Sequence, residues 1–399
     1  MATHTPDSTE PTRLETGTEA VERRIFEAHE GGKLTVEPTA PIDNADDLAI
    51  VYTPGVARVV EEIAEKPEKA REYTIKKNTV AVVTDGSAIL GLGDRGPLAA
   101  LPVMEGKAAL FSRFADVDAF PICLDAHEVE DIVAHVKAIA PAFAGINLED
   151  ISAPRCFEIE DRLRAELDIP VFHDDQHGTA VCVLAALTNA LTIVEKPIEE
   201  VRIAMSGAGA AGTAILRLLL AAGARDVIVT NSKGIVREGR EAGDRLEWIA
   251  RHTNPRKVEG GLREAVEGAD VFIGVSVPNI LDEAMLRSMN ERAIVFALSN
   301  PVPEVDPEIA WKYAAVVATG RSDFANQINN VLAFPGVFRG LIDAHACEVT
   351  DEALLAAAQA IASVVSDEEL SPRHIVPSVF DERVTPAVAR AVARTGEPR

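Results

Sequence analysis

Short apolar runs alternate with longer amphipathic stretches along most of the chain. In the first half, strand-like runs are separated by stretches in which apolar residues recur at helical spacing. The strand-like runs are TVAVVT (79–84), FPICL (120–124), AFAGIN (142–147) and IPVF (169–172). The helical stretches between and after them cover residues 102–114, 128–139 and 154–167. This alternation predicts parallel βαβ units with helices on the faces of a sheet.

A second series of the same kind fills the second half of the chain. An Ala- and Leu-rich stretch predicts a helix over residues 178–194, and a strand-like run then leads into a glycine-rich turn. The further strand-like runs cover residues 227–231, 270–276, 293–300 and 314–320. Helical stretches over 353–365 and 386–394 close the chain. The whole pattern predicts an α/β fold, with an N-terminal α/β catalytic domain followed by a Rossmann-type domain that has a parallel sheet.

The predicted domain limits follow from where the two series meet. We expect a disordered tail over 1–18, a catalytic and substrate domain over 19–170, and a dinucleotide-binding domain with C-terminal helices over 171–399. A first helix is predicted over 19–30, and the proline-containing stretch 36–50 is predicted to be a loop. Clefts between domains are common ligand sites, so we expect the functional site near this junction.

The composition excludes several classes of function. The 399 residues carry a net charge of −24, and 47% of them are hydrophobic. Binding to nucleic acid needs a basic surface, so no nucleic-acid partner is expected. No apolar run is expected to reach the length of a membrane span, and the polar N-terminus lacks a signal-peptide pattern. Four cysteines without metal-binding spacing favour reduced thiols and a cytoplasmic location.

Two acidic pairs follow strand-like runs of the first series. Glu149 and Asp150 come after AFAGIN, and Asp174 and Asp175 come after IPVF. Ligands bind at the carboxyl ends of strands in open α/β sheets, and four carboxylates there repel one another unless a cation neutralises them. Oxygen ligands of this kind suit Mg²⁺ or Mn²⁺. Taken alone, the two pairs fit helix N-caps as well as they fit a metal site.

A glycine fingerprint opens the second series. Gly207, Gly209 and Gly212 have G-x-G-x-x-G spacing, with Ala210 and Ala211 inside it, between a predicted strand and a predicted helix. The first glycine permits a tight turn, the second lets the backbone approach a pyrophosphate, and the third allows close packing of helix on strand. The motif predicts NAD or NADP bound at the helix N-terminus, and a purely structural turn is the alternative.

The strand after the fingerprint bears on the choice of coenzyme. It ends in Asn231, which Ser232 and Lys233 follow. NAD-binding domains usually place an acidic residue here, where it accepts hydrogen bonds from the ribose 2′-hydroxyl. Asn231 is neutral, whereas Ser232 and Lys233 can donate hydrogen bonds to a 2′-phosphate. The sequence therefore slightly favours NADP over NAD.

Several further polar residues stand in positions that suit a site. Tyr52 precedes a Thr-Pro-Gly turn, and Lys107 lies among apolar residues in a helical stretch. Burial would lower the pKa of Lys107 towards that of a useful general base. A tyrosine that only packs, and a lysine that extends its amine to water, are the alternatives. The neutral amides of Asn300, Asn329 and Asn330 can bind a carboxylate or carboxamide, or can simply belong to turns.

Seven segments of the chain together strongly resemble malic enzyme, in the shorter prokaryotic subfamily. They are VYTPGVA, TDGSAILGLGDRGPLAALPVMEGKAALF, NLEDI, VFHDDQHGTA, SGAGAAG, LSNP and QINNVLAFPG, and the resemblance runs from about residue 20 to about residue 385. The family oxidatively decarboxylates (S)-malate to pyruvate and CO₂, with NAD or NADP and a divalent metal. The resemblance implies the same activity here.

The resemblance also implies roles for individual residues. Tyr52 matches the general acid of the family, Lys107 its general base, and Asp174 the carboxylate associated with that pair. Glu149, Asp150 and Asp175 match the metal ligands. Asn300 and Asn330 match amides that contact the substrate or the nicotinamide. Relatives form homodimers or homotetramers, and in some short ones the tyrosine is expected to reach the site across the dimer interface.

One departure from the family pattern concerns substrate binding. Larger relatives have an arginine just before the ILGLGD segment, where this chain has Ala88. Backbone amides of the loop 91–96 are the expected substitute for that contact. Three other functions stay open at this point: a malolactic enzyme with tightly held NAD, a catalytically silent dinucleotide-binding regulator, and a metal-independent amino-acid dehydrogenase.

Overall fold

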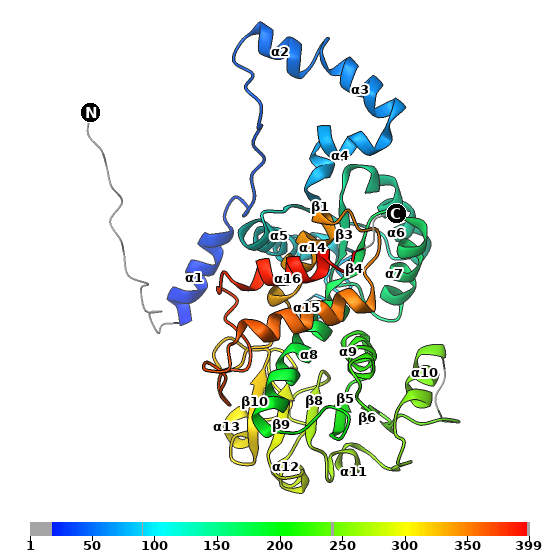
Figure 1. Ribbon diagram of the computed structural model, residues 1–399, viewed down its shortest axis with the longest axis vertical. Coiled ribbons are helices and arrows are strands. Elements are labelled where there is room, and N and C mark those ends of the chain that lie inside the picture. Colours follow the sequence, from blue (N-terminus) through cyan, green and yellow to red (C-terminus); the bar gives the residue numbers. More distant parts are fainter. Residues whose placement is uncertain (1–17, 90, 241–242, 397–399) are drawn as a thin grey trace, which may run out of the picture.

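The computed structural model describes residues 18–89, 91–240 and 243–396, and contains two sheets of mainly parallel strands (Figure 1). The first sheet has the strand order β2-β1-β3-β4 with parallel pairing throughout. Its strands are β1 (Thr79–Thr84), β2 (Asp118–Cys123), β3 (Gly145–Leu148) and β4 (Val171–His173). The helices α5 (Pro97–Ala115), α6 (Val129–Ile139) and α7 (Arg155–Glu166) connect them in turn. The predicted βαβ units of the first half are therefore confirmed.

The second sheet has six strands in the order β10-β9-β8-β5-β6-β7. Its strands are β5 (Arg202–Ser206), β6 (Asp226–Asn231), β7 (Gly234–Ile235), β8 (Val271–Gly274), β9 (Ala293–Ala297) and β10 (Ala314–Thr319). Its connecting helices are α9 (Ala210–Ala221), α10 (Asp244–His252), α11 (Leu262–Val266), α12 (Glu283–Ser288) and α13 (Pro307–Ala310). The predicted Rossmann-type sheet is confirmed, except that the short edge strand β7 pairs antiparallel with β6.

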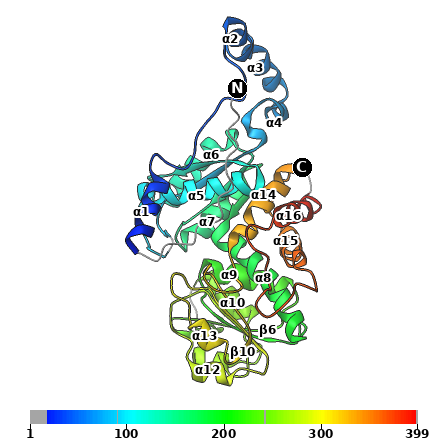
Figure 2. The same cartoon turned by 90° about the vertical axis from the view of Figure 1, so that its left-hand side faces the viewer.

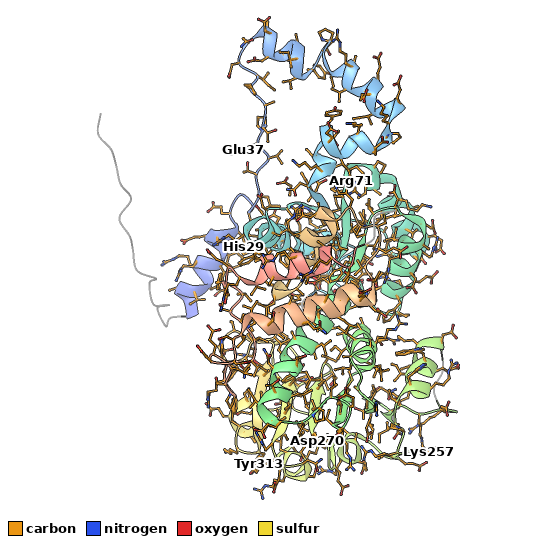
Figure 3. The ribbon with its side chains drawn as sticks, viewed as in Figure 1. His29, Glu37, Arg71, Lys257, Asp270 and Tyr313 are labelled. Carbon is orange, nitrogen blue, oxygen red and sulfur yellow. The ribbon has the colours of Figure 1, made fainter. Side chains whose placement is uncertain are left out.

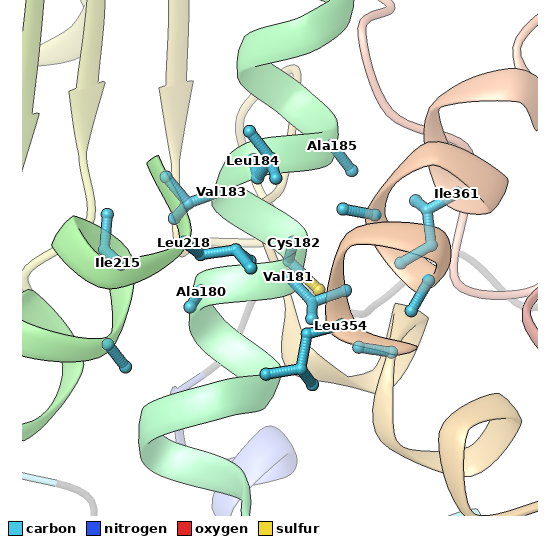
Figure 4. Packing of buried hydrophobic residues seen from close by; sticks show 14 of the residues in the cluster. Ala180, Val181, Cys182, Val183, Leu184, Ala185, Ile215, Leu218, Leu354 and Ile361 are labelled. Atoms are coloured by element: carbon cyan, nitrogen blue, oxygen red, sulfur yellow. The ribbon is translucent and has the colours of Figure 1, made fainter. Parts of the chain in front are cut away.

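The long helix α8 (Asp174–Val194) runs between the two domains. It is apolar on nearly all sides, and this composition is typical of a helix buried in a core. Figure 4 shows Ile215 and Leu218 of α9 packed on one side of it, and Leu354 and Ile361 of α15 (Asp351–Val364) on the other. It is long and apolar enough to cross a membrane, and 72% of an apolar 18-residue stretch within it is buried inside the protein. The prediction that no such run exists was wrong, because a central core helix meets the same criterion.

The C-terminal helices pack mainly against the first domain and α8. The rings of Phe334 and Phe338 in α14 (Phe334–Asp343) lie 4.7 and 5.2 Å from the ring of Phe111 in α5. Figure 1 shows α14, α15 and α16 (Val384–Ala393) beside the first sheet. We had assigned these helices to the dinucleotide-binding domain, but α14 also packs against helix α5 of the catalytic domain. A boundary after residue 170 also separates β4 from the sheet in which it pairs with β3.

The N-terminal segment forms an arm that projects from the body (Figures 1 and 2). The helix α1 (Thr18–His29) confirms the predicted helix, and residues 1–17 of the predicted tail lie outside the described residues. We call residues 37–73 the arm; Glu37 and Arg71 lie near its two ends in Figure 3. It carries α2 (Ala45–Val51), α3 (Val56–Glu65) and α4 (Ala70–Tyr73), none of which has a buried residue.

The predicted loop over 36–50 is wrong in its last part, where α2 begins. The side chain of Asn44 accepts hydrogen bonds from the backbone N–H groups of Asp46 and Asp47. This N-cap satisfies donors that the first turn of a helix leaves without partners. The prolines in this stretch favoured a loop, so the N-cap at Asn44 was not predicted from the sequence.

Candidate active site

A cleft of about 950 Å³ contains many of the residues that the sequence singled out. Helix α5 contributes Lys107, the segment after β3 contributes Glu149 and Asp150, and α8 contributes Asp175. The dinucleotide-binding half contributes residues from its own loops and from the start of α9. These residues are Ala210, Ala211, Asn300, Asn329 and Asn330. The cleft thus brings three of the four acidic residues, the lysine and the two alanines of the glycine fingerprint together from both halves of the chain.

Lys107 is almost completely buried and lies between two carboxylates. Its Nζ is 2.5 Å from Oδ2 of Asp174 and 2.9 Å from Oε1 of Glu149. Burial by itself lowers the pKa of Lys107, but the negative charges of Asp174 and Glu149 outweigh it and raise that pKa above the ordinary value. The expectation of a lowered pKa was therefore wrong. Burial was foreseen correctly, but the two partner carboxylates act more strongly in the opposite direction.

Asp174 holds Lys107 in place and is itself held from a distant part of the chain. Its Oδ2 also accepts a hydrogen bond of 2.5 Å from Nδ2 of Asn330, which lies 156 residues away. A Cβ atom at Gly178, one turn further along α8, would lie only 1.9 Å from Oδ1 of Asp174. Position 178 therefore requires glycine for this carboxylate to fit. The geometry joins Asp174, Lys107 and Asn330 in one buried cluster.

Asp175 has different partners from its neighbour. Its Oδ2 accepts a hydrogen bond of 2.9 Å from the backbone N–H of Asp150 and lies 3.2 Å from Nε2 of His173. Burial raises the pKa of Asp175, but His173 outweighs it and the net pKa is lowered. Both aspartates also lie in the first turn of α8, where the helix dipole favours negative charge. The two neighbouring aspartates thus have different partners, and of the two only Asp174 contacts the lysine.

The chemistry of the acidic residues fits a hard divalent cation. Glu149, Asp150 and Asp175 line the same cleft and are oxygen ligands, which Mg²⁺ and Mn²⁺ prefer. Burial raises the pKa of Glu149 well above its usual value, and the three aspartates add to this effect although Lys107 opposes it. A cation would offset that excess of negative charge.

The carboxylates are not arranged around a common centre in this structure. Among the described residues, no three His, Cys, Asp or Glu side chains form a group that could hold a metal ion as they stand. Glu149 is directed to Lys107, and Asp175 is directed to His173. Binding of a cation would require these two side chains to exchange partners. The metal-ligand roles of Glu149, Asp150 and Asp175 stay predictions.

A buried hydrogen-bonded network lies behind the acidic pair. Glu160 of α7 accepts hydrogen bonds from Nε2 of Gln176 at 2.9 Å and from the backbone N–H of His173 at 3.3 Å. Its Oε1 also lies 2.7 Å from Nε2 of His177. Sequence reasoning missed these residues. Gln176 and His177 directly follow the acidic pair and could have been noticed, whereas nothing marks Glu160 in the sequence.

The three fingerprint glycines occupy the positions that dinucleotide binding requires. Gly207 has a φ of +115°, and a Cβ there would lie 2.6 Å from the carbonyl oxygen of Val275. A Cβ at Gly212 would lie 2.0 Å from the carbonyl oxygen of Gly207, so the third glycine permits close packing. At Gly209 a Cβ would meet nothing within 4 Å. The open position and the uncapped start of α9 leave room for a pyrophosphate.

The residues proposed to select the coenzyme stand at the end of β6. Oδ1 of Asn231 accepts a hydrogen bond of 2.8 Å from the backbone N–H of Lys233. Ser232 and Lys233 are exposed. None of the three lines the cleft that contains Lys107. Their placement next to the fingerprint strand β5 agrees with contact to the adenosine end of a dinucleotide, and their role stays a prediction.

Tyr52 is the one predicted catalytic residue that lies far from the cleft in a single chain, because Asp174 does not line the cleft but contacts Lys107, which does. It ends α2 on the arm, its side chain is 66% exposed, and it does not line the cleft. The glycine-rich loop near Ala88 does reach the cleft, and the backbone N–H of Ala88 donates to the carbonyl oxygen of Asp150. The cleft residues that were missed in the sequence include His29, which ends α1, and Lys33, which follows it.

Comparison with known proteins agrees with this geometry. A model of the malic enzyme N-terminal domain matches residues 31–164, and a model of the malic enzyme NAD-binding domain matches residues 176–396. The chain belongs to the malic enzyme family. The resemblance that the sequence motifs suggested is therefore confirmed, and the fold class with it.

Individual members of the malic enzyme family are similar along nearly the whole chain. An NAD-dependent malic enzyme of Geobacillus stearothermophilus is 57% identical, over 95% of this chain and 80% of its own length. A bifunctional malic/malolactic enzyme of Bacillus subtilis is 52% identical, over 91% of this chain and 89% of its own length. The crystal structure of a malic enzyme from Pyrococcus horikoshii has a TM-score of 0.91 at 49% identity, covering 94% of this chain and 90% of that one.

Proposed function

We propose that this chain oxidatively decarboxylates (S)-malate to pyruvate and CO₂, reduces NAD or NADP, and depends on Mg²⁺ or Mn²⁺. The observation that carries the proposal is the single cleft lined by Lys107, by three carboxylates and by the start of the dinucleotide-binding helix, with Asp174 paired to Lys107 beneath it. Membership of the malic enzyme family supports the reaction. The metal is supported by the excess of buried negative charge.

The described residues suit the proton transfers of this reaction. Lys107 is placed to take the proton of the C2 hydroxyl while hydride passes to the nicotinamide. Its ammonium form is stabilised by Asp174 and Glu149, so it becomes a base only when their charge is offset. A cation bound by Glu149, Asp150 and Asp175 would supply that offset and polarise the C2 oxygen of the substrate. Asn330 and Asp174 would keep the amine in position.

A direct assay tests the proposal. Initial rates are measured with malate, Mn²⁺ and each nicotinamide coenzyme, with and without EDTA, and pyruvate, lactate and reduced coenzyme are all quantified. We expect pyruvate and reduced coenzyme in equal amounts, and loss of both with EDTA. Lactate without net reduced coenzyme would instead assign malolactic activity, which one relative combines with malic activity. Turnover that survives EDTA would contradict the metal requirement.

The exposed arm supports a homodimer as the active form. Large hydrophobic residues of the arm are at least 37% exposed at eight positions. They are Ile42, Leu48, Ile50, Val51, Tyr52, Val56, Val60 and Tyr73. Monomeric proteins rarely expose so much apolar surface together, whereas association covers it. We propose that the arm packs on a second copy of the chain and that Tyr52 acts as general acid in the cleft of that partner.

A mixed dimer shows whether Tyr52 acts in the cleft of the partner or in the cleft of its own chain. Dimers of Tyr52→Phe with Lys107→Ala, selected through two different tags, are expected to retain about half of the wild-type rate, because one of the two equivalent sites is intact. Each variant alone is expected to be nearly inactive. If Tyr52 served its own chain, both sites of the mixed dimer would be damaged and its rate would stay at the level of the single variants.

The end of β6 supports a preference for NADP, although the family contains enzymes named for each coenzyme. We expect Lys233→Ala to lower kcat/KM for NADP by roughly tenfold, since a hydrogen bond to a charged group is lost. The value for NAD should change little. The exposed Lys312 provides a control, because Lys312→Ala should alter neither value. An equal loss with both coenzymes, or a large preference of the wild type for NAD, would contradict the assignment.

A further inference from the structure

A second cavity of about 750 Å³ lies between α7 of the first domain and the helices α9 and α10 of the second. In Figures 1 and 2 these helices lie where the two domains meet. None of its lining residues also lines the cleft that contains Lys107. It is therefore a separate space on the molecule, and the proposed reaction does not use it.

The cavity is rich in arginine, in contrast to the acidic chain as a whole. Five arginines and four carboxylates line it, whereas the complete chain carries a net charge of −24. The arginines are Arg162, Arg164, Arg217, Arg245 and Arg251. Three of them have hydrogen-bonding partners within the chain: Arg162 contacts Glu130, Arg164 donates to the carbonyl oxygen of Val349, and Arg251 donates to that of Glu247.

Arg217 and Arg245 differ from the other three. Within the part of the chain that the structure describes, neither forms a hydrogen bond or an ion pair. Their guanidinium groups lie over aromatic rings, Arg217 at 5.1 Å from Trp248 and Arg245 at 4.6 Å from Phe157. Nη1 of Arg245 is buried without an acceptor. A buried donor without a partner is costly, so this atom indicates an acceptor that the protein itself does not supply.

We propose that this cavity binds a small multivalent organic or inorganic anion through Arg217 and Arg245. Guanidinium groups on two neighbouring helices suit phosphate or carboxylate oxygens, with which arginine forms paired, charge-assisted hydrogen bonds. The rings of Trp248 and Phe157 pack on the guanidinium groups of Arg217 and Arg245 and limit their rotation. The five arginines outnumber the four carboxylates, which disfavours a cation, and an uncharged ligand would leave the two guanidinium charges unpaired.

The cavity also has a physical connection to the catalytic carboxylates. Glu160, Gln176 and His177 line it, and they belong to the buried network that holds His173 beside Asp175. A bound anion would therefore act on the position of Asp175 through packed, hydrogen-bonded groups. Binding of the anion does not depend on the proposed reaction.

Calorimetric titration of the complete wild-type protein tests the site without any assay of turnover. Inorganic phosphate and citrate are titrated separately in metal-free buffer, with and without saturating NADP. Arg217→Gln and Arg245→Gln are each expected to weaken binding roughly tenfold or more, because each removes charge-assisted hydrogen bonds. Arg225→Gln is the matched control, since Arg225 is exposed and lies outside the cavity. The tighter of the two probes identifies phosphate or carboxylate chemistry.

Three outcomes would overturn the proposal. They are absence of binding of both probes to the wild type, equal affinity in the two cavity variants and the control, and displacement of the anion by NADP, which would place it on the coenzyme site. Thermal unfolding of each variant shows whether it is folded, and Arg217→Lys keeps the charge while removing the planar fork. An intermediate affinity of Arg217→Lys would support guanidinium recognition.

Discussion

Replacing Lys107 with alanine is expected to lower kcat for malate oxidation by roughly 10²–10⁴-fold, the usual contribution of a positioned acid–base group. Nζ of Lys107 is the basic atom that Asp174 and Glu149 hold in the cleft. Its removal deletes the group that takes the C2 hydroxyl proton. Decarboxylation of oxaloacetate should be lost with it. Stopped-flow measurement of coenzyme reduction and a separate oxaloacetate assay give the two rates.

Two further variants separate loss of the base from loss of structure. Lys107→Arg keeps a positive charge between the two carboxylates but cannot act as a base, because arginine stays protonated. It should be nearly as inactive as alanine while unfolding at a higher temperature than alanine. Lys196→Ala disrupts another lysine–aspartate pair, with Nζ 2.6 Å from Oδ1 of Asp270, outside the cleft. It should leave kcat unchanged. Near-normal turnover of Lys107→Arg would show that only the charge matters.

Replacing Asp175 with alanine is expected to weaken Mn²⁺ binding by more than the roughly 10–100-fold that loss of an outer-sphere partner costs. The reason is that Asp175 contributes a ligand oxygen itself and also fixes the backbone N–H of Asp150, another candidate ligand. Electron paramagnetic resonance titration of free Mn²⁺ measures this binding directly, without turnover. Coenzyme affinity, followed by fluorescence, should change little, because the glycine fingerprint is intact.

The controls for Asp175 address the partner that it leaves behind. Asp175→Asn retains an oxygen near His173 without the charge, so it should unfold near the wild-type temperature yet bind Mn²⁺ weakly. Asp168→Ala removes an exposed aspartate nearby in the sequence and should not alter the titration. If the Mn²⁺ titration of Asp175→Ala matched that of the wild type, Asp175 would not be a ligand. Asp150 and Glu149 would then require separate tests.

Local features of the structure were largely predictable. The run TVAVVT coincides with β1 over all six residues, because consecutive β-branched apolar residues suit a fully buried parallel strand. The glycine fingerprint was placed correctly, since a Cβ atom at Gly207 or Gly212 would clash with a nearby carbonyl oxygen. The acidic pairs were located at strand ends from chain order alone. Such features depend on neighbouring residues, and the sequence shows neighbours directly.

Features that depend on distant partners were not predictable from residues alone. The raised pKa of Lys107 needs Asp174 and Glu149 beside it, and no spacing in the sequence reveals that arrangement. The placement of α14 against α5 rests on aromatic contacts between residues more than two hundred positions apart in the chain order. Glu160 had no signal at all, because its role comes only from the packing of α7 against β4 and α8.

The sequence by itself determined the α/β alternation, the dinucleotide fingerprint, the family, and the two acidic pairs as the centre of interest. Only the tertiary structure divided those pairs, with Asp174 on Lys107 and Asp175 on His173. It also placed Tyr52 on an exposed arm away from the cleft of its own chain. The physical reason is the same in each case. Charges and hydrogen bonds act over a few ångströms in space, and only folding decides which distant residues come that close.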